Sequence, residues 1–169
     1  MTLAQQTAIM DKCYRLITTF QHGKPPRGIV APWWESSRQG TELMLRYGLS
    51  YDHSFSHHDC QPYYLRTGDS WTAIDYAQHP REWMKPLTKG TVTGLVEIPA
   101  SWYKDDLPPL VFIKGAPNSH GWVSTRVLEE IWLDQFAYYY REEEDGFVMP
   151  ITIHPDACGH PHALLMLER

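Results

Sequence analysis

The segment Pro150-Ile-Thr-Ile-His-Pro-Asp156 decides the fold that we expect for this chain of 169 residues. From Phe147 to Ile153, bulky apolar side chains recur without charge, which predicts a short buried strand. The strand is expected to end at His154, because Pro155 cannot donate the next hydrogen bond of a ladder. An imidazole at a strand end lies where catalytic groups gather in α/β folds. A structural histidine that hydrogen-bonds its own loop explains the spacing equally well.

Helical and extended patterns alternate along the rest of the chain. A helix is predicted from Thr2 to Phe20, with a capping box of Thr2 and Gln5 and an apolar face made by Ile9, Cys13, Leu16, Ile17 and Phe20. The other predicted elements are strands at 28–31, 49–51, 95–98 and 110–113, and helices from Ser36 or Ser37 to Tyr47, from Ser124 to Arg141 and from about Pro161. Residues 60–90 follow no period for long, and Pro80 is expected to open a short helix there. This order predicts βα units in a mainly parallel sheet or barrel, and one domain that is incomplete.

Composition narrows the class of protein. The formal net charge is -5 and both signs are interspersed, so no basic face indicates nucleic acid. No apolar run is long enough for a membrane span, and the first residues lack a signal-peptide pattern, so we expect a cytoplasmic protein. The three scattered cysteines fit reduced thiols. Seven Trp and ten Tyr, many of them in apparent loops, fit either a sugar-stacking surface or a core closed by long loops.

Polar groups follow several of the predicted strands. They are Trp33-Trp34-Glu35, Asp52-His53, His57-His58-Asp59, Lys114 and His154. If the strands are parallel neighbours, these groups converge on one face and predict a site. The i, i+4 spacing of His53 and His57 would suit a metal on a helix, but the segment looks extended, so histidines that hydrogen-bond within a loop are the default.

An unperturbed imidazole has a pKa of about 6.5, so His154 could give a proton to a poor leaving group such as an amine. Glu35 or Asp59 could orient that imidazole or bind the substrate. The aromatic candidates for stacking on a sugar are Trp34, Tyr63, Tyr64, Trp71 and Trp102, with packing in a core or lid as the alternative. There is no Gly-rich phosphate loop and no G-x-S-x-G elbow, so nucleotide binding and a serine nucleophile lack support.

Three long stretches resemble the later motifs of the polysaccharide deacetylase family, in the branch of peptidoglycan deacetylase-like and allantoinase-like proteins. They are Lys24-Pro-Pro-Arg-Gly-Ile-Val-Ala-Pro-Trp-Trp-Glu35, Gly48-Leu-Ser-Tyr-Asp-His-Ser-Phe-Ser-His-His-Asp59 and Ile151-Thr-Ile-His-Pro-Asp156. Shorter support comes from Asp69-Ser-Trp-Thr, Glu82-Trp-Met-Lys-Pro86, Asp105-Asp-Leu-Pro-Pro109 and Asn118-Ser-His-Gly121. The resemblance implies an α/β fold, the C-terminal portion of a NodB-type distorted (β/α) barrel over residues 1–169.

The implied activity is hydrolysis of a non-peptide C–N bond, usually the N-acetyl amide of a sugar in a chitin- or peptidoglycan-type polysaccharide. His154 falls on the family's late histidine, the proposed general acid. The residues expected to bind the substrate, a glycan or small amide, are Trp33, Trp34, Glu35, His58, Asp59, Tyr63 and Trp102. In this scheme a metal ion activates water, an aspartate takes its proton, and histidine protonates the leaving nitrogen.

Two departures from the family pattern limit that expectation. The family's divalent metal, zinc by expectation, is held by an aspartate and an H-x-x-x-H pair upstream of the segment that matches Ile29 to Glu35. Val30 replaces the arginine of the commoner R-x-P motif. We therefore predict that a full-length parent is a deacetylase-like hydrolase, and that this chain alone holds no metal and is inactive.

Three alternatives stay open at the level of sequence. The parent could be a metal-free hydrolase of ureides or cyclic imides, as in allantoinase-like proteins. The chain could be a degenerate carbohydrate-binding module that keeps only the aromatic surface. It could also be a truncated product whose open barrel edge leads to self-association, and hence to a homo-oligomer.

Overall fold

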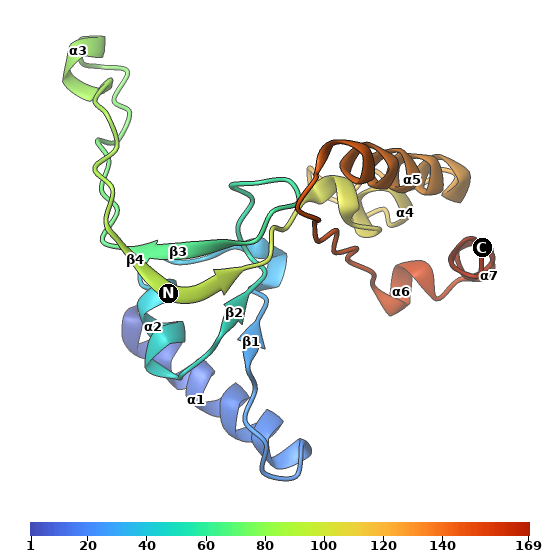
Figure 1. Cartoon of the computed structure of the whole chain (residues 1–169), viewed down its shortest axis with the longest axis horizontal. Helices are drawn as coiled ribbons and strands as arrows, with labels where there is room; N and C mark the ends of the chain where they lie inside the picture. The colour runs from blue at the N-terminus through green and yellow to red at the C-terminus, as the bar shows by residue number, and fades with distance from the viewer. The chain divides into compact units, whose positions relative to one another are not determined.

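The computed structural model describes residues 1–169, which form two compact units. We call the first the sheet unit; it comprises Met1–Phe55 and Tyr63–Glu97. We call the second the helical unit; it comprises Ser56–Pro62 and Ile98–Arg169. Figure 1 labels the elements of both units along the chain. No helix of either unit is both long and apolar enough to cross a membrane.

The sheet unit is built on four strands in the order β1-β2-β4-β3. Strands β1 (Gly28–Ile29), β2 (Tyr51–Asp52) and β4 (Thr91–Glu97) are parallel, whereas β3 (Tyr63–Thr67) runs antiparallel to β4. The parallel part confirms the predicted arrangement, but the prediction missed β3, which lies in the stretch without a period. The register places Tyr51 beside Gly28, where an added Cβ would lie 2.1 Å from the tyrosine ring, so only glycine fits there.

Two helices pack on this sheet. Helix α1 (Leu3–Phe20) begins with the predicted capping box, and α2 (Gly40–Arg46) begins three residues after the expected Ser37. The core consists of Met44, Leu49, Leu65 and Leu95, and α1 contributes Met10 and Tyr14. The predicted helix is confirmed, but the apolar residues of its predicted face are not part of this core. The residues of that face are exposed, Phe20 by 85%, because no element of the unit covers that side of the helix.

Between β3 and β4 the chain makes a long excursion over residues 68–90 (Figure 1). Its tip carries α3 (Pro80–Trp83), the short helix expected from Pro80. Two links stabilise its base: the Ser70↔Thr88 bridge, and Asp69, whose carboxylate binds Arg66 at 2.7 Å and accepts the Gly90 N–H at 2.6 Å. The excursion is thus an ordered arm of the sheet unit.

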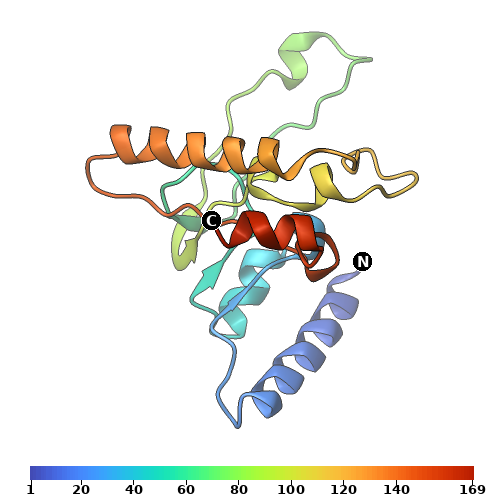
Figure 2. The same ribbon diagram turned by 90° about the vertical axis from the view of Figure 1, so that its right-hand side faces the viewer.

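The helical unit contains one long helix and several short ones. Helix α5 (Thr125–Glu142) starts at the predicted Ser124 N-cap, and α7 (Pro161–Leu167) starts where expected. The two helices lie side by side (Figure 2). Their contact forms the core of the unit, made by Leu128, Trp132, Cys158, Ala163 and Met166. The shorter elements are η2 (Trp102–Lys104), α4 (Leu107–Leu110) and α6 (Pro155–Cys158).

Two predicted strands are wrong. At 110–113, Leu110 is the last residue of the short helix α4, whose first turn contains Pro108 and Pro109, and residues 111–113 form no regular element. The segment from Phe147 to Ile153 is not a regular strand and is not buried. It pairs only through the Thr152↔Asp105 bridge, and Val148, Ile151 and Ile153 are 42–51% exposed. A buried strand needs neighbouring strands on both sides, whereas this segment forms a single β-bridge, on one side only.

Candidate active site

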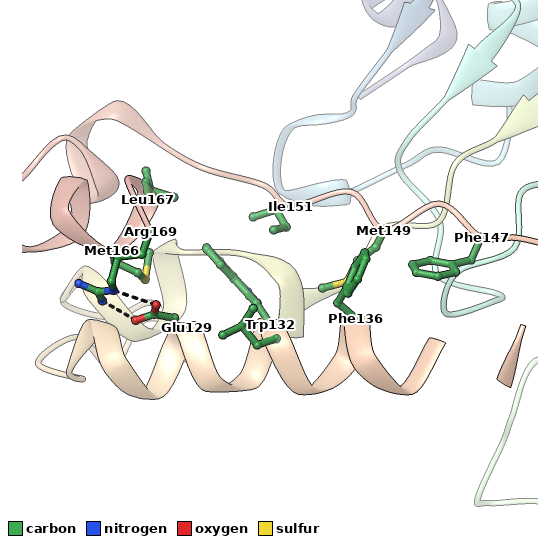
Figure 3. A pocket seen from close by; sticks show the side chains of 10 residues that line it. Glu129, Trp132, Phe136, Phe147, Met149, Ile151, Met166, Leu167 and Arg169 are labelled. Atoms are coloured by element: carbon green, nitrogen blue, oxygen red, sulfur yellow. Dashed lines mark hydrogen bonds and ion pairs between the residues drawn. The ribbon is translucent and has the colours of Figure 1, made fainter. Parts of the chain in front are cut away.

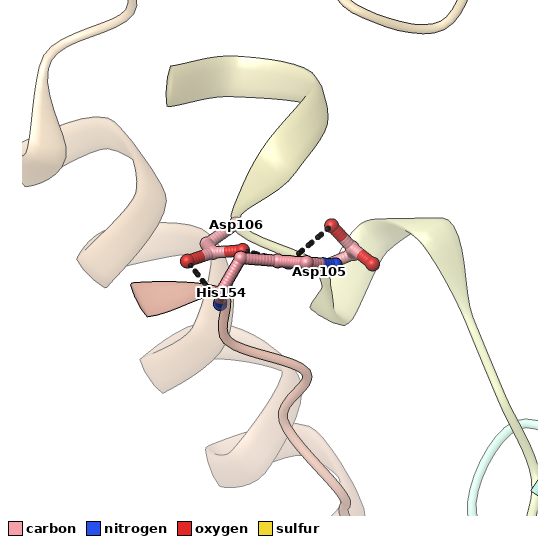
Figure 4. Close-up of side chains that lie close together, drawn as sticks. All are labelled: Asp105, Asp106 and His154. Carbon is pink, nitrogen blue, oxygen red and sulfur yellow. Dashed lines mark hydrogen bonds and ion pairs between the residues drawn. The ribbon is translucent and has the colours of Figure 1, made fainter. Parts of the chain in front are cut away.

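An aspartate–histidine pair forms the centre of the candidate site in the helical unit. The Nδ1 atom of His154 lies 2.7 Å from Oδ1 of Asp106, and the backbone N–H of His154 donates to Oδ2 of the same carboxylate at 2.9 Å (Figure 4). Asp106 is fully buried, while the His154 side chain is 35% exposed. Because both carboxylate oxygens bind the same residue, the imidazole is fixed in orientation, and its Nε2 atom is left to act on a substrate.

Backbone pairing brings these two residues together across 48 positions of sequence. Thr152 donates its N–H to the Lys104 carbonyl at 2.8 Å and accepts the Asp106 N–H at 3.1 Å. His154 then stops the extended segment, as predicted, and Pro155 opens α6. The predicted end of a strand is therefore found as the single Thr152↔Asp105 bridge, followed at once by the start of α6.

The charges around His154 favour its protonated form. Burial alone disfavours the imidazolium, but its hydrogen bond to the Asp106 carboxylate and the negative charges of Asp105, Asp106 and Asp156 outweigh the effect of burial, so the pKa of His154 is raised. For Asp105, burial raises the pKa of the carboxyl, against the opposing hydrogen bond from the Leu107 N–H. A raised pKa favours the protonated imidazole, which is the form that a general acid needs.

Asp105, Asp106 and His154 could also hold a metal ion, since they bring one ligand atom each to within 4.8 Å of one another. No sequence pattern predicted metal ligands at this place. However, their atoms are already engaged: Nδ1 of His154 binds Asp106, Asp106 Oδ2 accepts a backbone N–H, and Oδ1 of Asp105 accepts the Leu107 N–H at 2.7 Å. Coordination through Nδ1 of His154 would require its hydrogen bond to Asp106 to break, whereas a carboxylate oxygen that accepts an N–H keeps a lone pair for an ion. The structure shows a hydrogen-bonded aspartate–histidine pair, and the three side chains lie close enough together to be candidate metal ligands.

A second pair of carboxyl groups is buried in the sheet unit at the ends of β2 and β4. Oε1 of Glu97 accepts the N–H groups of Ser54 and Phe55, both at 2.8 Å, and the Ser54 hydroxyl donates to Asp52 at 2.6 Å. Burial raises the pKa of Glu97 to about 8, helped by the charge of Asp52. The other oxygen of each carboxyl is buried without a hydrogen-bond partner. One of the two groups is thus kept protonated at neutral pH.

The loop that follows β2 gives two predicted substrate-binding residues local roles. Nδ1 of His58 accepts the N–H of Gln61 at 3.0 Å, as a loop histidine would. The carbonyl of Asp59 accepts a hydrogen bond from Nζ of Lys104 at 2.6 Å, and the buried Lys104 also lies over the Tyr139 ring. Burial lowers the pKa of Lys104. These contacts account for the loop's shape, and substrate binding by His58 and Asp59 stays a prediction.

The predicted aromatic residues fall in different environments. Trp33 and Trp34 lie in the short helix η1 (Pro32–Trp34) with φ of 57° and 53°, a conformation that is strained for bulky residues and that clusters at functional sites. Trp33 is half-exposed. Tyr63 packs against the core of the sheet unit, which favours its structural alternative. Trp102, in η2, is 39% exposed.

Glu35 lines a cavity of about 330 Å³ that is also lined by Asp52 and Ser54 in the sheet unit. Trp33, Trp34, Glu35 and Tyr63 belong to this unit, whereas His58, Asp59, Trp102 and His154 belong to the helical unit. Sequence reasoning missed the partner of His154. Only Leu107 separates Asp105-Asp106 from the Pro108-Pro109 pair, and two adjacent acids at such a break were the available signal.

An α/β fold with a histidine at the end of an extended segment agrees with the family resemblance seen in the sequence. Comparison with curated proteins confirms that the chain is similar to proteins named peptidoglycan deacetylase. It is 51% identical over its whole length to peptidoglycan deacetylase of Helicobacter pylori and spans 57% of that protein. It is 38% identical to the peptidoglycan deacetylase-like protein FGM2 of Gibberella zeae, over 97% of this chain and 50% of that protein.

Solved structures agree on the fold. The chain matches a Mycobacterium smegmatis protein described as a polysaccharide deacetylase with a TM-score of 0.71 and 22% identity, over 96% of this chain and 47% of that one. It matches Puue allantoinase with a TM-score of 0.69 and 20% identity, over 100% of this chain and 46% of that one. No protein-family model matches the sequence. The chain thus has the predicted α/β fold and spans about half the length of the curated relatives it matches.

Proposed function

We propose that this chain carries the proton-donating half of an amide hydrolase site, with His154 as the general acid. The observation that carries the proposal is the pair of hydrogen bonds between His154 and the buried Asp106 carboxylate, one at Nδ1 and one at the backbone N–H. The substrate class is a glycan with N-acetyl groups, as the names of the curated relatives suggest.

The chemistry follows from the dyad. When water adds to the acetyl carbonyl, the C–N bond can break only if the departing nitrogen gains a proton, because an amide anion is a very poor leaving group. The Nε2–H of His154 supplies that proton and leaves a neutral imidazole. The carboxylate of Asp106 holds the tautomer and stabilises the imidazolium before the transfer. The products are a free amine on the sugar and acetate.

Nothing near the dyad supplies the first half of the reaction. Oδ1 of Asp105 is bound to the Leu107 N–H, and the Asp52–Glu97 pair is buried in the sheet unit. The family resemblance places water activation, by an aspartate and a divalent metal, in motifs that precede the matched segment. We therefore propose that the chain alone does not turn over a substrate.

Substrate binding is proposed for the strained Trp33-Trp34 pair and Glu35. The indole of Trp33 is half-exposed and its backbone is strained, so it offers a rigid surface on which a sugar ring can stack. The nearby carboxylate of Glu35 can accept hydrogen bonds from sugar hydroxyls. A degenerate glycan-binding module would share these contacts. Calorimetry with N-acetylglucosamine oligomers tests the binding itself, which Trp33→Ala should weaken, and only turnover, measured as described next, separates an enzyme part from a binding module.

The role of His154 is tested in a single polypeptide that joins this chain to the part of the H. pylori deacetylase that it does not span. Release of acetate from N-acetylglucosamine oligomers is measured against pH. Because the acid must be protonated, kcat should fall as pH rises through the His154 pKa, and Asp106→Asn should move that fall to lower pH. His154→Ala should abolish turnover, whereas His120→Ala, at an exposed histidine of the same unit, should not change it.

Two results would contradict the proposal. The first is acetate release by the isolated chain that is lost in His154→Ala, which would show that the chain carries a complete site. The second is a pH profile that Asp106→Asn leaves unchanged. Hydrolysis of a ureide or cyclic imide instead of the acetylated glycan would assign the same dyad to the allantoinase-like alternative.

A further inference from the structure

The four residues 32–35 of the sheet unit, which we call the tryptophan turn, bury little of their own side-chain surface. Pro32, Trp33 and Glu35 are exposed, Trp33 by 50%, and Trp33 and Trp34 both have a positive φ. A cavity of about 330 Å³ lies against the turn and is lined by Pro32 and Glu35 among others. Bulky residues keep such a backbone conformation only where the surrounding structure holds it. The tryptophan turn therefore depends on backbone contacts with neighbouring elements.

The hydroxyl of Ser54, two residues after β2, provides such a contact. Its Oγ accepts the N–H of Ala31 at 2.9 Å, and Ala31 is the residue that precedes η1. Just before this point the ladder of β1 and β2 contributes a backbone bond from the His53 N–H to the Ile29 carbonyl, at 3.1 Å. In a continued parallel ladder, Ala31 would donate to a backbone carbonyl. The Ser54 hydroxyl takes the place of that carbonyl and fixes the residue at which the tryptophan turn begins.

Two buried carboxyl groups hold Ser54 itself. Its Oγ donates to Oδ1 of Asp52 at 2.6 Å, and its N–H donates to Oε1 of Glu97 at 2.8 Å. Ser54 is 4% exposed, and the two carboxyl residues are completely buried. Because the single hydroxyl proton is given to Asp52, Oγ acts as an acceptor towards Ala31. A chain of hydrogen bonds with a fixed direction thus connects the buried carboxyl pair to the tryptophan turn.

We propose that Ser54 is a positioning residue for sugar binding, because it holds the tryptophan turn in the conformation that presents the Trp33 indole to a sugar ring. This inference rests on the proposed substrate-binding role of Trp33 and Glu35. Loss of the hydroxyl would remove the acceptor of the Ala31 N–H, beside a cavity that leaves the turn room to move. The turn would then populate other conformations, and the apparent affinity for a sugar would fall with the fraction that is competent to bind.

A second surface with aromatic side chains gives the alternative place for a sugar ring. It is an apolar groove of about 540 Å³ in the helical unit, between α5, α7 and residues 147–151 (Figure 3). Phe136 lines it and is 50% exposed. The charged groups of its lining, Glu129 and Arg169, bind each other, so the groove offers little for sugar hydroxyls. The tryptophan turn fits a sugar better, because it combines an exposed indole with the carboxylate of Glu35.

The hold of Ser54 on the turn is tested in the full chain by amide hydrogen exchange, without any ligand. The N–H groups of Trp34 and Glu35 bond to the carbonyls of residues 31 and 32, at 2.9 and 3.1 Å, and so report the conformation of the turn. Ser54→Ala should speed their exchange by about tenfold or more. Ser54→Thr keeps the hydroxyl and should restore slow exchange.

Thr93→Val is the matched control for the loss of a hydroxyl. The Thr93 hydroxyl, in β4 of the same unit, also accepts a backbone N–H and donates to a backbone carbonyl, but it does not bond to the turn. The exchange at Trp34 and Glu35 should therefore be unchanged in this variant. If Ser54→Ala does not fold, Ser54→Cys replaces it, because a thiol keeps the size of the side chain and is a weaker acceptor; it should change the exchange in the same direction.

Sugar binding is then measured by calorimetry with N-acetylglucosamine oligomers. Ser54→Ala should weaken the binding by about tenfold, and Ser54→Thr should restore it. In a chain that already carries Trp33→Ala, Ser54→Ala should cause no further loss, because its effect passes through that indole. Phe136→Ala and Thr93→Val should leave the affinity unchanged. A purely structural role of Ser54 would lower the stability without this coupling to Trp33.

Four results would overturn the proposal. Equal exchange at Trp34 and Glu35 in the wild type and in Ser54→Ala would show that the hydroxyl does not hold the turn. Losses of affinity for Ser54→Ala and Trp33→Ala that add in the double variant would mean that Ser54 acts elsewhere. Binding that is lost in Phe136→Ala and kept in Trp33→Ala would place the sugar in the groove. A wild type that binds no oligomer would refute the proposed binding role of the turn itself, a failure that the ligand-free exchange rates distinguish from a failure of Ser54 to hold it.

Discussion

The buried Glu97 carboxyl makes the stability of the sheet unit depend on pH. Its pKa rises from 4.5 to about 8 because burial disfavours the charged form. The folded state therefore binds one proton more than the unfolded state between these values, and stability is full below pH 4.5 and falls as pH rises towards 8. At about 1.4 kcal/mol for each pKa unit, the upper limit of the loss is on the order of 5 kcal/mol.

Glu97→Gln removes this titration while keeping an oxygen for the N–H groups of Ser54 and Phe55. The free energy of unfolding in urea, measured from pH 5 to 9, should fall with pH in the wild type and less steeply in the variant. At pH 9 the variant should be the more stable by a few kcal/mol, on the scale of the linkage relation. Glu42→Gln, at an exposed glutamate of α2, controls for the loss of a surface charge.

The outcome that refutes this reasoning is a wild-type profile that stays flat from pH 5 to 8 and coincides with that of Glu97→Gln. Such a result would mean that Glu97 is solvated or paired in solution. The comparison is made as a difference between the two proteins, because titrating groups that do not interact with Glu97 then cancel, whereas the shift of its neighbour Asp52 is part of the effect that is measured.

Three further predictions follow from single contacts. Gly28→Ala should destabilise the sheet unit by about 1–3 kcal/mol in urea unfolding, because a Cβ would overlap the Tyr51 ring; an unchanged midpoint would show that the ring moves freely. Asp106→Asn should lower the pKa of His154 in an NMR titration, and no change would remove Asp106 as the cause of its raised value. Thr2→Ala should cost about 1 kcal/mol through loss of the capping box, seen as reduced helicity and a lower melting temperature; equal melting curves would contradict the cap.

Features set by neighbouring residues could be predicted from the sequence. The capping box of Thr2 and Gln5 and the N-cap at Ser124 are formed as expected. So is the helix that Pro80 opens. In each case the residues that make the hydrogen bonds lie within three or four positions of one another, so the pattern contains the whole interaction.

Features that need a distant partner could not be predicted. The apolar stripe of α1 predicts a helix correctly, but periodicity does not say which element covers it, and the stripe is exposed. Strand β3 carries Arg66 and Thr67 and shows no clear alternation, so only its pairing with β4 reveals it. The run from Phe147 to Ile153 has the composition of a strand and lacks the neighbours that would make it one.

The two residues of the candidate site also differ in whether they could be predicted from the sequence. His154 could be found because proline ends an apolar run beside it, whereas Asp106 is 48 residues away and nothing in the sequence pairs the two. The adjacent Asp105-Asp106 pair was visible as a motif but had no predicted role, because only the fold brings the Asp106 carboxylate next to His154.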